Sequence, residues 1–299
     1  MRARSMRMVT ILILLLVALL STNSVGSSSQ QESVIPNQGT ILVLDDFADT
    51  IFFEYGAETG VLEPHWDIAG GSGSGSQGNS YIRVDNTHVR TGNQAVKFYS
   101  EPPPKDDMAR RMVLRLWNTG HKEIYMSWWL YLDSIYSEDT SPWGTMIGAV
   151  NAWFGPPENM WYWLTSARFY LSQTRRIATS YRLPFWPEGV DTWEYYDTVR
   201  PPLNEWLHFQ IYVRWAVDNT GVYRWWYNGN LVREVTGIKT DPEGYGEWES
   251  DYGYVGGAPY PAISVLLYYD TDSPEKWYWV DDIVGATEKV PETYRVTGK

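Results

Sequence analysis

Apolar and polar residues alternate with a period of two along several stretches of this chain, as in β-strands whose two faces meet different surroundings. In residues 123–133, Ile124 and Met126 belong to an apolar set, and the residues between its members are polar or aromatic. The same alternation occurs in residues 110–117 and 206–215. Convincing helical periodicity is absent from the sequence. The pattern therefore predicts an all-β chain.

Turn signals separate these predicted strands. Asn228-Gly229 lies between the strand-like residues 222–227 and 231–235. Asn-Gly between two such runs is the strongest short-range sign of a hairpin. Residues 263–270 and 277–284 are predicted to form two further strands. Many short strands separated by turns are typical of a β-sandwich or a jelly roll.

The first 26 residues have the order of a secretory signal peptide: three arginines, an apolar run and a small polar stretch. The apolar run is shorter than the roughly 20 residues needed to span a bilayer. We therefore expect cleavage, a secreted or cell-surface protein, and no membrane span in the mature chain. Residues 27–40 should form a flexible leader. After the leader we expect one folded domain over residues 41–287 and a C-terminal tail over residues 288–299.

Composition narrows the function classes. The chain of 299 residues has 36 acidic and 24 basic residues and a formal net charge of −12, which argues against general nucleic-acid binding. The absence of cysteine excludes disulfides, thiolate metal sites and cysteine nucleophiles. The sequence contains 17 Trp and 22 Tyr, and the second face of the predicted strands carries aromatic residues together with Arg. Aromatic rings stack on sugars, and Arg matches a carboxylate, so this face suits an acidic polysaccharide.

Several segments resemble the concanavalin A-like jelly-roll β-sandwich, which has two antiparallel sheets. They are residues 203–209 (LNEWLHF), 213–215 (VRW), 221–229 (GVYRWWYNG), 45–47 (DDF) and 279–283 (WVDDI). Polysaccharide lyases of this fold, including the glucuronan, alginate and heparin lyase types, carry similar segments. The resemblance implies that the first and last strands pair. It indicates the fold more specifically than the reaction, because this fold hosts lectins, hydrolases and lyases.

A lyase that cleaves a uronic acid polymer needs a group at the carboxylate, a base for the C5 proton and an acid for the leaving oxygen. In the lyases that this sequence resembles, Tyr and His transfer protons, and Arg, Asn or Gln lie at the carboxylate. The catalytic candidates are His208, Tyr212, Tyr125 and Arg115. The candidates for substrate binding are Arg111, Arg214, Gln210, Trp117, Trp129 and Tyr131. We expect all of them on one concave sheet face.

The resemblance also implies a structural calcium ion. Sugar-binding jelly rolls often hold Ca²⁺ between a carboxylate of the first strand, a loop and an Asp of the last strand. Hard oxygen ligands of this kind suit the ion. The matching residues are Asp46, the turn at residues 88–93, Asp281 and Asp282. We expect no organic cofactor.

The sequence leaves three other functions open. A glycoside hydrolase would use alternating carboxylates such as those of residues 247–251 (EWESD), although their order differs from that of related hydrolases. A noncatalytic carbohydrate-binding module would keep the aromatic residues without a proton-transfer group. A structural cell-envelope protein would present a flat aromatic patch to a partner. The Arg-bearing face favours a lyase over these alternatives.

Overall fold

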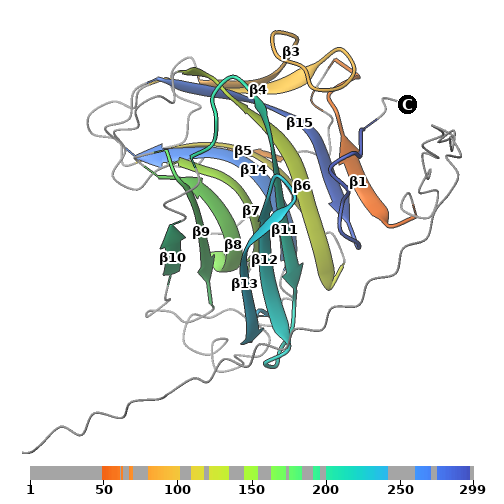
Figure 1. Ribbon diagram of the computed structural model, residues 1–299, viewed down its shortest axis with the longest axis vertical. Coiled ribbons are helices and arrows are strands. Elements are labelled where there is room, and N and C mark those ends of the chain that lie inside the picture. The colour runs from red at the N-terminus through yellow and green to blue at the C-terminus, as the bar shows by residue number, and fades with distance from the viewer. Residues whose placement is uncertain are drawn as a thin grey trace, which may run out of the picture. The chain divides into compact units, whose positions relative to one another are not determined.

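The computed structural model describes most of the region that the sequence assigns to the folded domain, and the described residues lie in one compact unit, Leu44–Lys299 (Figure 1). They are residues 49–60, 62, 67–69, 80–101, 109–117, 121–134, 145–153, 163–172, 175–183, 191–195, 200–241, 260–270 and 275–296. The expected signal segment and leader, Asp46 and residues 247–251 lie outside these ranges. Within them, no helix has the length and apolar character needed to cross a bilayer.

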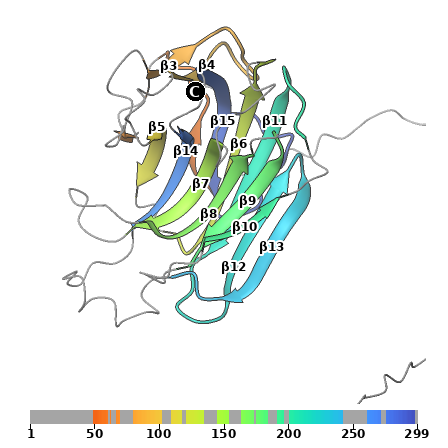
Figure 2. The ribbon, with the colours of Figure 1, turned by 90° about the vertical axis from the view of Figure 1, so that its left-hand side faces the viewer.

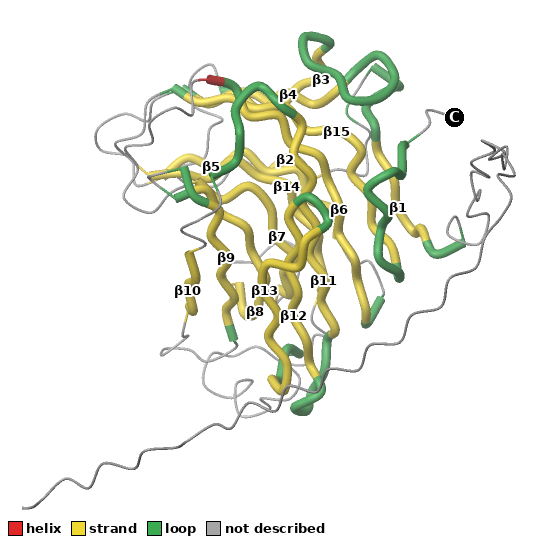
Figure 3. The backbone as a smooth tube through the Cα atoms, in the orientation of Figure 1, coloured by secondary structure: helices red, strands yellow, loops and turns green. Residues whose placement is uncertain are grey.

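Strands form two antiparallel sheets, which confirms the all-β jelly-roll sandwich (Figures 1 and 3). The eight-stranded sheet has the order β13 (Asn230–Ile238), β12 (Gly221–Tyr227), β11 (Trp206–Arg214), β6 (Glu123–Leu132), β15 (Lys276–Ala286), β4 (Ala95–Ser100) and β3 (Tyr81–Asp85), and β1 (Ile51–Tyr55) also pairs with β15. The seven-stranded sheet has the order β10 (Asp191–Tyr195), β9 (Ile177–Arg182), β8 (Trp163–Leu171), β7 (Thr145–Trp153), β14 (Tyr260–Asp270), β5 (Ala109–Trp117) and β2 (Asp67–Ala69).

The strands predicted from alternation are confirmed, with ends that differ by a few residues. The hairpin between β12 and β13 turns at Asn228 and Gly229, where φ is 43° and 72°. Positive φ at both central residues is the geometry for which Asn-Gly is selected. The first described strand, β1, pairs with the last strand, β15, whereas residues 45–47, which the resemblance assigns to the first strand, lie outside the described ranges.

Large apolar side chains fill the space between the sheets. Trp128 of β6 stacks on Phe209 of β11 with 5.6 Å between ring centroids, and Phe169 of β8 meets Phe209 edge to face at 5.1 Å. All three are fully buried. Gly148 of β7 lies against Trp128, and a Cβ atom there would overlap the indole ring. The core therefore depends on close packing across the two sheets.

β15 contains an irregularity that determines what lies on the outer face of the eight-stranded sheet. Its register with β6 shifts between Asp281 and Val284, and Asp282 has a φ of 46°. A bulge of this kind re-aims side chains. As a result, Asp281 and Asp282, although consecutive, both contact the turn at residues 90–91.

Candidate functional site

The predicted site residues lie on two different sheets. His208, Gln210, Tyr212 and Arg214 come from β11, and Tyr125, Trp129 and Tyr131 come from β6, all in the eight-stranded sheet. Arg111, Arg115 and Trp117 come from β5 in the seven-stranded sheet. The expectation of one shared face is wrong, because the hydrophobic core separates the outer faces of the two sheets. Alternation predicts which residues share a face of one strand, but it does not predict which sheet the strand joins.

His208 is enclosed on the outer face of the eight-stranded sheet. It is 1% exposed, its Nε2 lies 2.7 Å from Ser127 Oγ, and its ring stacks on Trp129. Burial, with Arg90 as the largest of three nearby positive charges, lowers the pKa of His208 to about 3. The imidazole is therefore neutral at physiological pH, and the protein itself encloses it.

The enclosure comes from the C-terminal segment, residues 287–296, which packs on this face. Gln210 forms a reciprocal pair with Val290: its Nε2 donates to the Val290 carbonyl at 3.0 Å, and its Oε1 accepts from the Val290 amide at 3.2 Å. Glu292 Oε1 lies 3.7 Å from His208 Nδ1. Val290 and Val296 are buried. Two of the predicted site residues, His208 and Gln210, are thus covered by the chain itself.

The remaining candidates on this sheet contact one another and their neighbours. Tyr212 donates to Glu123 Oε2 at 2.6 Å, and Arg214 Nε donates to Glu123 Oε1 at 3.2 Å. Burial and then Glu123 raise the pKa of Tyr212 to about 12, and burial also raises the pKa of Tyr125. A phenol with a raised pKa is a weaker proton acceptor at neutral pH, because less of it is ionised.

Arg115 belongs to a different group, which we call the arginine row. Backbone pairing across β5, β14, β7, β8 and β9 places Arg115, Ser264, Ala149, Arg168 and Ser180 side by side. Figure 2 shows β5, β14, β7 and β8 next to one another. Neighbouring strands are about 4.8 Å apart, so the backbones at Arg115 and Arg168 are about 14 Å apart. Small residues lie between the two arginines. The side chains of Arg111 and Trp117 lie outside the described residues.

Polar side chains continue beside the arginine row. Asn151 of β7 pairs with Ser166 of β8, one step further along the strands. Both are buried, and among the described residues no hydrogen-bond partner meets Asn151 Oδ1, Ser166 Oγ, Ser180 Oγ or Ser264 Oγ. Native structures seldom leave buried polar atoms without partners, so a group of them marks a candidate site for a ligand or for ordered water.

Arg168 and Tyr170 add a positive charge and a phenol to this face. They lie on the same face of β8, and Arg168 Nη1 donates to the Tyr170 hydroxyl at 3.3 Å. Both are buried, at 3% and 5% exposure. The sequence interpretation missed them, although residues 165–171 alternate between core residues such as Phe169 and this polar set. That alternation was the signal that could have identified this strand.

Two of the predicted calcium ligands, Asp281 and Asp282, do not fit a cation, and the third, Asp46, lies outside the described residues. Asp281 Oδ2 accepts hydrogen bonds from the Arg90 and Thr91 amides, and Asp281 Oδ1 accepts from the Asp282 amide. Asp282 pairs with the Arg90 guanidinium and accepts from Thr91 and Val296. Across the described ranges, no group of three or more His, Asp or Glu residues could hold a metal ion.

Comparisons with known proteins agree with this architecture. The polysaccharide lyase family profile matches residues 57–284. The fold is similar to that of endo-β-1,4-glucuronan lyase from the fungus Trichoderma reesei, with a TM-score of 0.58, 16% identity, and coverage of 80% of this chain and 96% of that chain. It is also similar to the cellulose-induced protein Cip1, with a TM-score of 0.52, 14% identity, and coverage of 80% and 98%. No curated protein matches the sequence. Because the family profile covers most of the chain, this protein belongs to the polysaccharide lyase family.

Proposed function

We propose that this protein cleaves an acidic, uronate-containing polysaccharide by β-elimination at the arginine row of the seven-stranded sheet. The observation that carries the proposal is the pair Arg115 and Arg168 on either side of small residues, next to buried polar atoms without described partners. A guanidinium offers paired donors that match a carboxylate. In a desolvated site this interaction is stronger than in water.

The groups of the site correspond to the needs of the reaction. β-Elimination removes the C5 proton, forms the C4–C5 double bond and expels the O4 oxygen, which takes up a proton. Arg168 and the Asn151 amide would stabilise the charge that develops on the carboxylate as the C5 proton leaves. Tyr170 would transfer protons. Its contact with Arg168 supports this role, because a nearby positive charge stabilises the phenolate that proton removal requires.

The earlier candidate His208 is less well suited to this role. It is neutral, but it lies under residues 287–296 and on the opposite sheet from Arg168. A base must come within hydrogen-bond reach of the proton that it removes. We therefore assign proton transfer to Tyr170 rather than to His208. Export of the mature protein, expected from the N-terminal sequence, would place the enzyme where such polymers occur.

The test is the ultraviolet absorbance of the new conjugated double bond during incubation with glucuronan, alginate, heparin, pectate and a neutral β-glucan. We expect an increase with at least one acidic polymer and none with the neutral polymer. Tyr170→Phe and Arg168→Gln should each lower kcat by at least about 100-fold, within the range for proton transfer and charge stabilisation.

The matched control is Arg83→Gln, which removes an arginine with a mostly exposed side chain on the other sheet. It should leave kcat unchanged. Absence of product with every acidic polymer, together with measurable binding to one of them, would replace the lyase with a noncatalytic binding module. Full activity in Tyr170→Phe would remove Tyr170 from the mechanism.

A further inference from the structure

The bulge of β15 creates a local excess of negative charge on the outer face of the eight-stranded sheet. Asp281 and Asp282 are adjacent in sequence, contact the same turn, and are 1% and 2% exposed. Two buried carboxylates side by side are costly unless positive charge and hydrogen-bond donors accompany them. The surroundings of this pair show how the protein meets that requirement.

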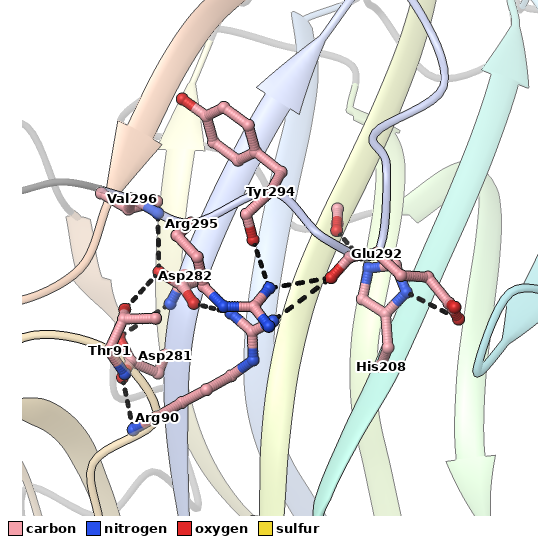
Figure 4. A network of polar contacts seen from close by, with 10 residues as sticks. Arg90, Thr91, His208, Asp281, Asp282, Glu292, Tyr294, Arg295 and Val296 are labelled. Carbon is pink, nitrogen blue, oxygen red and sulfur yellow. Dashed lines mark hydrogen bonds and ion pairs between the residues drawn. The ribbon is translucent and has the colours of Figure 1, made fainter. Parts of the chain in front are cut away.

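Arg90 supplies the positive charge. Its guanidinium forms an ion pair with Asp282, and its side chain is 5% exposed. The guanidinium carbon lies 3.5 Å from the centroid of the Trp129 ring, which adds a cation–π interaction. Arg90 Nη2 also donates to the Glu292 carbonyl at 3.3 Å. Figure 4 shows Arg90 between Asp282 and Glu292, so one side chain contacts β15, β6 and the C-terminal segment.

Backbone and hydroxyl donors complete the arrangement. The Arg90 and Thr91 amides donate to Asp281 Oδ2 at 3.0 and 3.2 Å. Thr91 Oγ1 donates to Asp282 Oδ1 at 2.7 Å, and the Val296 amide donates to the same oxygen at 2.9 Å. A calcium ion requires oxygen lone pairs directed at it, whereas these carboxylate oxygens already face N–H and O–H groups.

We propose that Arg90 is a built-in cation that takes the place of a structural calcium ion and clamps residues 287–296 onto the eight-stranded sheet. The clamp joins the turn containing Arg90 and Thr91 to a part of the chain that is far away in sequence: the bulge of β15 and the C-terminal segment that follows it. This role is independent of the proposed lyase activity.

The experiment combines thermal unfolding with hydrogen exchange. The melting temperature of the wild-type protein should be the same with EDTA and with added calcium. Arg90→Gln should lower the melting temperature and accelerate exchange of the amides in residues 287–296 by a factor on the order of 10 or more, because their local anchor is lost. Arg90→Lys should have a melting temperature and an exchange rate between those of the wild-type protein and Arg90→Gln. An ammonium keeps the charge, but it cannot reproduce the planar, two-sided contact of a guanidinium.

Two controls keep the test decisive. Arg83→Gln, in the neighbouring strand and with a mostly exposed side chain, should change neither the melting temperature nor the exchange of the C-terminal segment. Asp282→Asn combined with Arg90→Gln should destabilise less than the sum of the two single changes, because the second change removes the partner left uncompensated by the first.

Either of two results would overturn the proposal. One is a fall in the wild-type melting temperature on chelation that added calcium reverses, because a metal would then supply the charge. The other is unchanged exchange of residues 287–296 in Arg90→Gln, because the segment would then be held without the clamp. If Arg90→Gln does not fold, Arg90→Lys and Asp282→Asn provide the same exchange measurement.

Discussion

The buried, neutral His208 makes a specific contribution to the pH dependence of stability. Its pKa in the folded protein is about 3, lowered by burial and by Arg90, Lys289 and Arg295. In the unfolded chain it should have its ordinary value of about 6.5. Between these values the unfolded state binds a proton at this position that the folded state does not bind. Stability from this group is therefore fully present above pH 6.5 and is lost as the pH falls.

The magnitude follows from the linkage relation. Each pH unit below 6.5 removes about 1.4 kcal/mol of unfolding free energy through this one group. From pH 6.5 to pH 4.5 the loss is about 3 kcal/mol, a large share of the 5–15 kcal/mol typical of a domain. This loss of stability ends at about pH 3, where His208 also becomes protonated in the folded protein.

Urea unfolding of the wild-type protein and of His208→Gln between pH 7 and pH 4.5 isolates this effect. Burial and Asp282 raise the pKa of Asp281 to about 7, which gives a pH dependence of the opposite sign. That contribution is present in both proteins and cancels when one unfolding free energy is subtracted from the other. As the pH falls from 6.5 to 4.5, the unfolding free energy of the wild-type protein should decrease by about 3 kcal/mol relative to that of His208→Gln. Parallel pH profiles would refute the reasoning, because His208 would then titrate alike in both states.

Three packing and turn predictions can be tested by urea unfolding at neutral pH. Phe209→Ala should cost about 3–5 kcal/mol, since it leaves a cavity beside Trp128 in a fully buried core. A cost below about 1 kcal/mol would mean that the core can collapse around the change. Gly148→Ala should cost about 1–3 kcal/mol, because the added methyl group overlaps Trp128, and a neutral result would contradict the close approach. Asn228→Ala should cost about 1–3 kcal/mol, because Ala is strained at the positive φ of this position and cannot accept the hydrogen bond from the His208 amide. Asn228→Gly loses the same hydrogen bond but should cost less, because Gly adopts a positive φ without strain.

The candidate site shows which features the alternation of apolar and polar residues predicts and which it does not. The sequence pattern correctly separates His208 and Tyr212 from the apolar residues of the same strand, because both lie off the core-facing set. It does not predict that residues 287–296 cover His208, since that cover depends on contacts with Gln210 and Arg90, which are distant in sequence from this segment.

The sequence by itself determined the strands, the Asn-Gly hairpin and the jelly-roll class, because these depend on local periodicity and turn chemistry. It also indicated that arginines and aromatic residues lie on the strand faces that point away from the core. Only the tertiary structure decided that Arg115 and Arg168 belong to one row while His208 lies on the other sheet. It also decided that Arg90 forms an ion pair with Asp282, one of the residues expected to bind calcium. Strand order and long-range contacts create these groupings, and the local pattern carries no information about which distant strands become neighbours.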